Sequence, residues 1–252
     1  MSGEEKILEF LIETVKSGYE QIKDIKKEIL PKGARDIVTN CDLLIEKHII
    51  NQMKANYPNI EIISEEFNSK KDKKEEYFVI DPIDGTANFA NGLDMWDIQV
   101  AYTKKGEIIA SVMYMPELNV LITSLNGKGT FTNGEQTRAK EYMGLKNSIV
   151  AFGFARRRGE SEYNLMKEVH SKILSIRVWG AACFSLSMVA RGKIDACFLG
   201  NSKIWDIEPG LLACKEAGAK IYRNDLFTIV TNNEEIMQLI LNTAKITFKD
   251  NL

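Results

Sequence analysis

The sequence predicts an α/β protein whose N-terminal half is of the α+β type. Three patterns support this class: two amphipathic helical segments open the chain, alternating apolar residues predict several strands before residue 132, and strands alternate with helices beyond residue 140. The sequence contains no internal repeat and no long linker. We therefore expect two subdomains, 1–139 and 140–252, that share a cleft.

The first element is a predicted helix over residues 4–29. Its apolar residues recur at alternating spacings of four and three, which places them on one helical face: Leu11, Val15, Gly18, Ile22, Ile25 and Ile29. This stripe fits docking on the chain's own core, with a dimer interface as the alternative. The segment Pro31-Lys-Gly33 is expected to end the helix. Thr39 and Asp42 have the spacing of a capping box, so a second helix is predicted from there to about Tyr57.

Strands follow in the rest of the first half. Ile60–Ile63 and Tyr77–Ile80 are predicted as buried strands, and the polar, lysine-rich run 68–76 between them as a surface loop. An antiparallel meander with glycine-bearing turns is then expected, with strands at Trp96–Thr103, Glu107–Tyr114, Val120–Ser124 and Gly129–Phe131.

The second half of the chain is predicted to alternate between strands and helices. The strands are expected at Ser148–Phe152, Ile176–Trp179, Ile194–Leu199, Ala219–Tyr222 and Phe227–Val230. The helices are expected at Ser161–Ile173, Ala182–Ala190, Ile207–Ala217 and Glu234–Lys245. Gly192 and Gly218 follow two of these helices, where glycine tolerates the left-handed conformation that ends a helix.

The composition narrows the function. A net charge of −2 does not favour nucleic acid or an anionic membrane as a partner. No apolar run approaches the roughly 18–20 residues of a membrane span, the acidic start is no signal peptide, and the four cysteines have no CxxC spacing, so we expect a cytoplasmic protein. With only two histidines, a multi-histidine zinc site is excluded. The chemistry must rest on carboxylates, hydroxyls and metals.

One motif carries that chemistry. The predicted strand Tyr77–Ile80 ends at two acids, Asp81 and Asp84, and Gly85-Thr86 then opens a helical turn. Two acids on one turn provide the oxygen ligands that Mg²⁺ requires. A helix start offers unpaired backbone N–H groups that bind phosphate. The motif therefore predicts a metal site beside a phosphate site.

Other acids stand at the junctions of regular elements and loops. Glu65 follows a strand, Asp42 lies in the first turn of its predicted helix, and Asp206 directly precedes the predicted helix Ile207–Ala217. Each has an alternative structural explanation: Asp42 as the partner in a capping box, Asp206 as a helix cap, and the Asp81/Asp84 pair as turn residues. Periodicity alone does not show that these acids meet in space.

A family resemblance connects them. The block Asp81-Pro-Ile-Asp-Gly-Thr86, with Glu65-Glu66 upstream and Trp205-Asp206 downstream, closely resembles the inositol monophosphatase family of Mg²⁺-dependent, lithium-sensitive phosphatases. Further matching segments occur in order along nearly the whole chain: Asp36-Ile-Val-Thr-Asn-Cys-Asp42, Gly127-Lys-Gly129, Asn133-Gly134 and Gly180-Ala-Ala182. The resemblance implies a layered αβαβα sandwich of the inositol monophosphatase and fructose-1,6-bisphosphatase type, commonly a homodimer.

The resemblance also implies roles for residues. Two to three Mg²⁺ ions are expected: the first on Glu65, Asp81 and the Ile83 carbonyl, the second on Asp81, Asp84 and Asp206, and a third reached from Glu65 through water. Glu65, Thr86 and Asp42 are the implied catalytic residues, since Thr86 and Asp42 orient the attacking water. The implied substrate contacts are Asp84, Gly85, Thr86, Asp206 and the wall Gly180, Ala181 and Ala182.

The expected activity is hydrolysis of inositol monophosphate or a similar small phosphate ester. Animal members have a glutamate that touches inositol seven residues before the tryptophan-linked aspartate, and this chain has the apolar Leu199 there. Three arginines, Arg156-Arg157-Arg158, could bind a second phosphate, or form a solvated loop. The alternative substrates are therefore fructose 1,6-bisphosphate, NADP or a 3′-phosphoadenosine nucleotide, and histidinol phosphate. A non-catalytic regulatory protein is a third hypothesis, and the loop 68–76 either is solvated or closes over the site.

Overall fold

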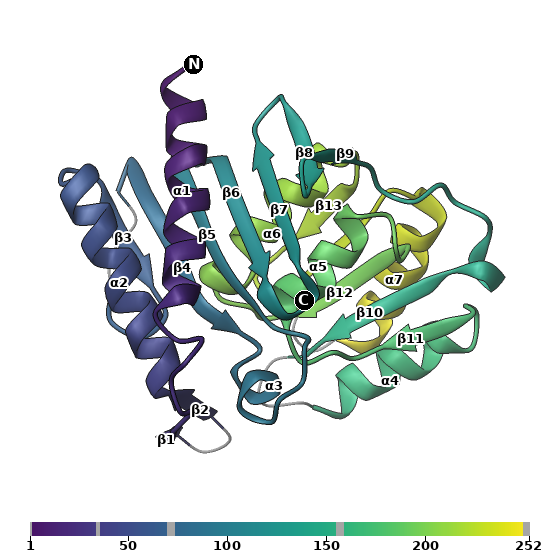
Figure 1. The fold of residues 1–252 in the computed structure, drawn as a ribbon. Helices are drawn as coiled ribbons and strands as arrows, with labels where there is room; N and C mark the ends of the chain where they lie inside the picture. Colours follow the sequence, from purple (N-terminus) through teal and green to yellow (C-terminus); the bar gives the residue numbers. More distant parts are fainter. Residues whose placement is uncertain (1, 34–35, 70–73, 155–158, 249–252) are drawn as a thin grey trace.

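The structure is a computed structural model, and it describes residues 2–33, 36–69, 74–154 and 159–248. Five layers alternate between helices and sheets (Figure 1). Two helices cover the outer face of a seven-stranded sheet, two more lie between this sheet and a five-stranded sheet, and two cover the far side. None of the helices in the described part of the chain combines the length and apolar composition that a membrane span requires.

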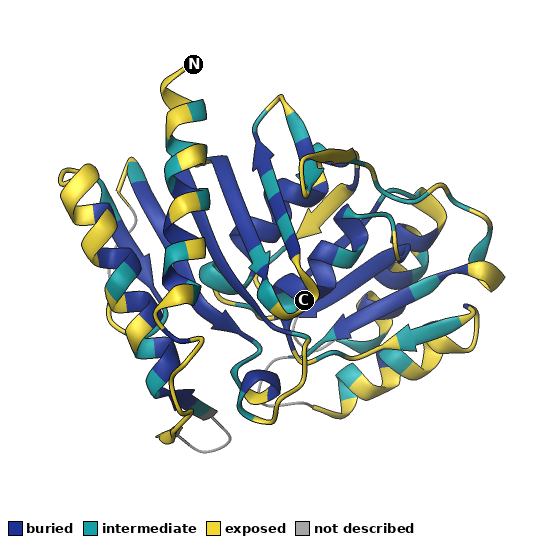
Figure 2. Cartoon of the chain, viewed as in Figure 1, coloured by how far each residue is buried: buried dark blue, intermediate teal, exposed yellow. Residues whose placement is uncertain are grey.

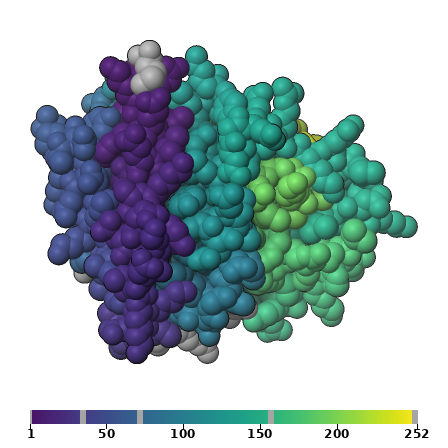
Figure 3. All heavy atoms as spheres, in the orientation of Figure 1, coloured from purple at the N-terminus to yellow at the C-terminus, as the bar shows by residue number. Residues whose placement is uncertain are grey.

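The seven-stranded sheet has its strands nearly in chain order. Its strands are β3 (Glu61–Ser64), β4 (Glu76–Asp84), β5 (Asp97–Lys104), β6 (Glu107–Met115), β7 (Val120–Leu125), β8 (Gly129–Thr132) and β9 (Glu135–Thr137). Only β3 and β4 pair in parallel; the others form an antiparallel meander. Helices α1 (Gly3–Glu20) and α2 (Asn40–Asn56) cover its outer face, and α1 forms a long ridge on the molecular surface (Figure 3).

The five-stranded sheet has the order β11-β10-β12-β14-β13. Its strands are β10 (Ile149–Gly153), β11 (Ser175–Arg177), β12 (Ala196–Gly200), β13 (Lys220–Arg223) and β14 (Phe227–Thr231). Strand β10 is parallel to both of its neighbours, and β14 is antiparallel to both of its own. Helices α4 (Glu160–His170) and α7 (Glu234–Thr247) pack together on its outer side.

Helices α5 (Ala182–Ala190) and α6 (Ile204–Glu216) form the middle layer, and both are largely buried (Figure 2). A helix that is apolar on all sides is stable only when covered on all sides. The two helices approach closely at Gly210, where a Cβ atom would lie 2.6 Å from the Leu186 side chain. Helix α6 also contacts β4 through β8 of the first sheet. This packing brings the start of α6 close to the end of β4.

The predicted layers and most predicted elements are confirmed. The capping box of Thr39 and Asp42 starts α2, helix α5 has the predicted bounds, and the four cysteines are buried and unbridged. The short strand β9 was not predicted. The division at residues 139 and 140 stays a prediction, although the two sheets lie on either side of it.

The prediction of one long helix over residues 4–29 was wrong. Helix α1 ends at Glu20, and the chain then forms a hairpin of β1 (Ile29–Gly33) and β2 (Asp36–Thr39). Ile25 and Ile29, placed on the helix stripe by their spacing, are 42% and 56% exposed. The spacing of apolar residues within a segment does not reveal whether that segment pairs with a strand later in the chain. Here Ile29, Leu30 and Pro31 pair with β2 instead of continuing the helix.

Candidate active site

The end of β4 places two acids at the edge of the sheet. Asp81 pairs with Gln99 of β5 and Asp84 pairs with Asp97, so one extra residue bulges between the two pairs. Gly85 follows with a φ of 87° and begins the short helix α3 (Thr86–Ala90). A Cβ atom on this glycine would lie 2.9 Å from the Ala181 Cβ atom. Only glycine fits both this conformation and this close approach.

A cavity of about 960 Å³ lies at this edge. Most of the residues predicted for the site line it: Glu65, Asp81, Ile83, Asp84, Gly85, Thr86, Gly180, Ala181, Ala182 and Asp206. Asp42 is buried behind this wall. Arg157 and the rest of the arginine run lie outside the described residues, as do residues 70–73 of the predicted loop. Four acids from three separate parts of the chain therefore face one cavity.

Asp84 joins the two halves of the chain. Its carboxylate accepts hydrogen bonds from the Ala182 and Cys183 backbone N–H groups, at 3.2 and 2.6 Å, which lie 98 and 99 residues further along. These groups belong to the first turn of α5, where a helix lacks internal acceptors and favours negative charge. Burial and the charge of Asp206 raise the Asp84 pKa to about 7, although the two hydrogen bonds oppose this shift.

Asp81 lies deeper. Its carboxylate accepts a hydrogen bond from the Ile83 N–H group at 3.1 Å, and the Gln99 amide nitrogen lies 3.5 Å away. Burial raises the Asp81 pKa well above its ordinary value, and the charges of Glu65, Asp84, Asp206 and Asp97 raise it further. The acids thus interact electrostatically across the cavity, and their negative charges are poorly balanced.

Asp97 is a further buried acid next to the site, and the sequence did not indicate it. It is fully buried, and neither of its carboxylate oxygens has a hydrogen-bond donor among the described residues. Burial and the charge of Asp84 raise its pKa well above the ordinary value. The feature of the sequence that could have indicated Asp97 is an acid within a strand whose residues are nearly all buried.

Asp206 lies in the first turn of α6. The N-cap residue of α6 is Lys203, not Asp206 as the structural alternative expected; the Asp206 Oδ2 atom, three residues into the helix, accepts a hydrogen bond from the Lys203 N–H group at 2.8 Å. The same residue lines the cavity. The hydrogen bond and the place in the cavity do not exclude each other, because one carboxylate has two oxygens and several lone pairs.

The buried Asp42 and the partly exposed Thr86 form a pair at the cavity wall. One Asp42 oxygen accepts hydrogen bonds from the backbone N–H group and the hydroxyl of Thr39, at 2.8 and 2.5 Å. The other lies 3.1 Å from the Thr86 hydroxyl, which is also 3.0 Å from the Ile83 carbonyl oxygen. A hydroxyl has one proton, so it serves one of these acceptors at a time. Burial raises the Asp42 pKa.

A lysine from the unpredicted hairpin enters the site. The Lys32 Nζ atom lies 2.8 Å from a Glu65 oxygen and 2.6 Å from a Glu66 oxygen. Burial lowers the Lys32 pKa, but the two neighbouring carboxylates outweigh burial and raise it overall. This ammonium group places positive charge directly beside Glu65. The sequence gave no sign of this role for Lys32, because the segment Pro31-Lys-Gly33 was expected to end a helix.

Glu46 of α2 holds the segment that carries Glu65. Its buried carboxylate accepts hydrogen bonds from the Ser64 hydroxyl at 2.5 Å and from the N–H groups of Glu66 and Phe67 at 2.9 and 2.7 Å. These donors flank Glu65 in the chain on both sides. Glu46 thus fixes the backbone from which the Glu65 side chain projects. The sequence could have indicated Glu46 by its position four residues after Asp42, because residues at this spacing lie on the same face of a helix.

The profile of the inositol monophosphatase family matches residues 4–235, which is most of the chain. The chain belongs to this family. The fructose-1,6-bisphosphatase/inositol-1-monophosphatase of Aquifex aeolicus is 32% identical over 241 residues, covering 92% of this chain and 90% of that protein. The Nus factor SuhB of Escherichia coli K12 is 30% identical over 236 residues, covering 89% and 88%.

The fold of this inositol monophosphatase family member agrees with solved structures. The extragenic suppressor protein suhB of Bartonella henselae superposes with a TM-score of 0.86 at 25% identity, covering 95% of this chain and 98% of that chain. The layered α/β sandwich expected from the sequence is therefore confirmed.

The acids fit the Mg²⁺ ions that the family implies. Among the described residues, no three acidic, histidine or cysteine side chains form a group that could hold a metal as they stand. Glu65, Asp81, Asp84 and Asp206 each have a protein hydrogen-bond donor nearby instead. The chemistry of the set still favours a hard cation: the ligands are all oxygens, and their charges repel one another.

We expect Glu46→Gln to weaken Mg²⁺ binding about 10- to 100-fold, because substitution of a residue that orients a metal ligand typically lowers metal affinity by this factor. A glutamine side chain has one acceptor oxygen and therefore loses at least one of the three hydrogen bonds around Glu65. Isothermal titration calorimetry with Mg²⁺ measures the change.

Asp195→Asn is the matched control. Asp195 is a buried acid outside the cavity that accepts hydrogen bonds from Lys140 Nζ at 3.0 Å and the Ile149 N–H group at 2.8 Å. The Asp195→Asn variant should be less stable than the wild type but should bind Mg²⁺ with the same affinity. Equal Mg²⁺ affinities in the two variants would contradict a positioning role for Glu46.

The pKa of Asp84 near 7 predicts how stability depends on pH. The pKa of an unfolded aspartate is about 4. Because the pKa of Asp84 is higher in the folded protein, the free energy of unfolding falls as pH rises from about 4 through about 7. Bound Mg²⁺ should offset this loss. The rise in Tm caused by Mg²⁺ should therefore grow between about pH 5 and pH 8, measured by differential scanning fluorimetry with chelator or excess Mg²⁺. A rise independent of pH would refute the assignment of these acids.

Proposed function

We propose that this protein is a Mg²⁺-dependent phosphomonoesterase that hydrolyses a small phosphate ester with water as the nucleophile. The observation that carries the proposal is the convergence of Glu65, Asp81, Asp84 and Asp206 on one cavity beside Gly85 and Thr86. Carboxylates from distant parts of the chain would not be brought together in this way without cations to neutralise them.

The residues have complementary roles in this proposal. Glu65, Asp81 and the Ile83 carbonyl would hold one ion, and Asp81, Asp84 and Asp206 a second. Mg²⁺ held by these residues would lower the pKa of a water molecule and would stabilise the charge that develops on the transferred phosphoryl group. Thr86 is the first residue of α3, so its N–H group has no acceptor within the helix and is available to a phosphate oxygen.

Asp42 and Thr86 orient the nucleophile. When the Thr86 hydroxyl donates its proton to Asp42, at 3.1 Å, the lone pairs of the hydroxyl remain to accept a hydrogen bond from water. Asp42 is itself fixed by the two hydrogen bonds from Thr39. The pair therefore positions a water molecule without a histidine, which agrees with the scarcity of histidine in the sequence.

Inositol monophosphate is one candidate substrate within this class. Leu199 is buried in the cavity wall, where it offers no hydrogen bond to a hydroxyl of an alcohol. The proposal therefore extends to other small phosphate esters, including the bisphosphates and nucleotides that the arginine run suggests. Homodimer formation, lithium sensitivity and cytoplasmic location stay predictions from the family resemblance and the composition.

The relatives named Nus factor SuhB support a second candidate, a regulatory role without catalysis. A regulatory protein has no need of a set of buried, mutually repelling acids, which destabilises the fold in the absence of metal. The complete acid set therefore favours the enzyme.

Asp84→Asn should lower phosphate release at saturating Mg²⁺ by at least about 100-fold, because it removes a ligand and a charge that the transition state requires. Release is measured colorimetrically on inositol 1-phosphate, ribose 5-phosphate and fructose 1,6-bisphosphate. Asp94→Asn makes the same change at an exposed residue and should leave the rate unchanged. Wild-type turnover in Asp84→Asn would rule out the proposed enzyme.

A further inference from the structure

One side chain of α3 connects this helix to the part of the cavity wall formed by residues 180–182, which we call the wall segment. This side chain is Asn88, which lies two residues after Thr86 and is 9% exposed. Its Nδ2 atom donates hydrogen bonds to the carbonyl oxygen of Met95 at 2.6 Å and to that of Trp179 at 2.7 Å. Trp179 directly precedes the wall segment and lies 91 residues further along the chain than Asn88. Asn88 therefore joins α3 to a distant segment that lines the cavity.

Both hydrogen bonds require the NH₂ group of the Asn88 amide. A carbonyl oxygen accepts hydrogen bonds but cannot donate them, so an aspartate side chain, which has nearly the same shape and no N–H donor, could not replace the amide. The amide also lies close to two glycine turns. A Cβ atom on Gly85 would be 3.5 Å from Asn88 Nδ2, and one on Gly180 would be 3.6 Å from Asn88 Oδ1. The Asn88 side chain thus packs against the start of α3 and against the wall segment.

The wall segment is held at both of its ends. At its start, the Trp179 carbonyl accepts the hydrogen bond from Asn88. At its end, the Ala182 and Cys183 N–H groups donate to Asp84. Asn88 and Asp84 both belong to the stretch that runs from the end of β4 into α3. The position of the wall segment relative to this stretch is therefore set by two contacts, and Asn88 supplies the first of them.

Resting on the phosphatase function proposed above, we propose that Asn88 is a positioning residue that sets where the wall segment meets the alcohol part of the substrate. The phosphate would lie beside Thr86 and the acids, whereas the wall segment would contact the alcohol. Asn88 fixes the distance between these two places. An ester spans both places, so its binding depends on that distance, whereas inorganic phosphate occupies only the first.

Asn88→Asp tests this role because it removes both hydrogen bonds and keeps the shape of the side chain. The KM for an ester should rise at least about fivefold, which is the order expected for the loss of two ordinary hydrogen bonds. The kcat should change by less than about twofold, because a wall contact binds the substrate and the transition state alike. The inhibition constant of inorganic phosphate should stay at the wild-type value. The rates are measured on inositol 1-phosphate, ribose 5-phosphate and fructose 1,6-bisphosphate.

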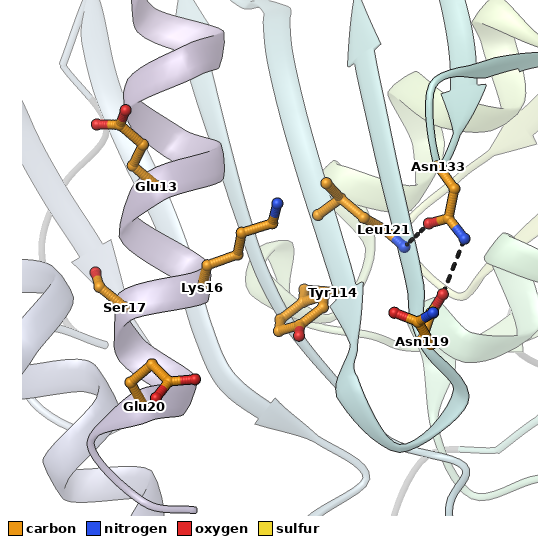
Figure 4. Close-up of a pocket in the computed structure, with 8 residues that line it drawn as sticks. All are labelled: Glu13, Lys16, Ser17, Glu20, Tyr114, Asn119, Leu121 and Asn133. Atoms are coloured by element: carbon orange, nitrogen blue, oxygen red, sulfur yellow. Dashed lines mark hydrogen bonds between the residues drawn. The ribbon is translucent and has the colours of Figure 1, made fainter.

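Asn133→Asp is the matched control. Asn133 lines a second cavity, of about 870 Å³, beside α1 (Figure 4), and the residues described as lining it all differ from those of the active-site cavity. The Asn133 side chain donates a hydrogen bond to the Asn119 carbonyl oxygen at 2.9 Å, so the substitution removes the same kind of bond between two segments. This variant should keep the wild-type KM. Asn88→Ala is a second variant that removes the amide without placing a carboxylate beside two carbonyl oxygens, and it should also raise KM.

A binding experiment separates this proposal from the proposed function. If the wild type hydrolyses none of the esters, equilibrium dialysis measures the affinities for inositol 1-phosphate and inorganic phosphate. An ester affinity at least about fivefold lower in Asn88→Asp, with an unchanged phosphate affinity, would then support the positioning role although the phosphatase function fails. If the esters are hydrolysed and both Asn88 variants keep the wild-type KM, the positioning role fails and the phosphatase function stands. An equal loss of affinity for ester and phosphate would also overturn the positioning role, because the effect would then lie at the phosphate site.

Discussion

The contact between the Asp84 carboxylate and the start of α5 is the interaction on which the site depends. It joins the end of β4 to the middle helical layer through two backbone hydrogen bonds. Because α5 packs closely on α6 at Gly210, the same contact also fixes the helix that carries Asp206. One carboxylate thus links the first sheet, both central helices and the cavity. A site assembled in this way is intact only when both halves of the chain are folded together.

This arrangement balances two opposing electrostatic effects. Helix starts and backbone N–H groups favour negative charge at Asp84 and Asp206, whereas burial and mutual repulsion disfavour it. Lys32 relieves part of the repulsion on the side of Glu65. No comparable cation contacts Asp81 or Asp97 among the side-chain contacts described above, so the interior of the site retains unbalanced charge. A bound divalent cation is the physical remedy that the family chemistry supplies.

Much of this was predictable from the sequence. Strand and helix periodicity predicted most of the elements, and the spacing of Thr39 and Asp42 predicted the start of α2, because these signals are local. The arrangement in layers came from the family resemblance. The convergence of the acids is not local, so it required a family resemblance. Lys32, Glu46 and Asp97 escaped because their roles depend on tertiary contacts: a hairpin, a buried helix face and a strand register. The prediction of one helix over residues 4–29 also failed: α1 ends at Glu20, and residues 29–31 pair with β2, a later segment that the helical spacing does not include.

The most direct test of the account is anomalous diffraction from crystals soaked in Mn²⁺, which substitutes for Mg²⁺ at oxygen ligands. The account predicts anomalous peaks within coordination distance of the carboxylates of Glu65, Asp81, Asp84 and Asp206, with Asp84 and Asp206 sharing one ion. Crystals that diffract well and contain no Mn²⁺ at these side chains would contradict it.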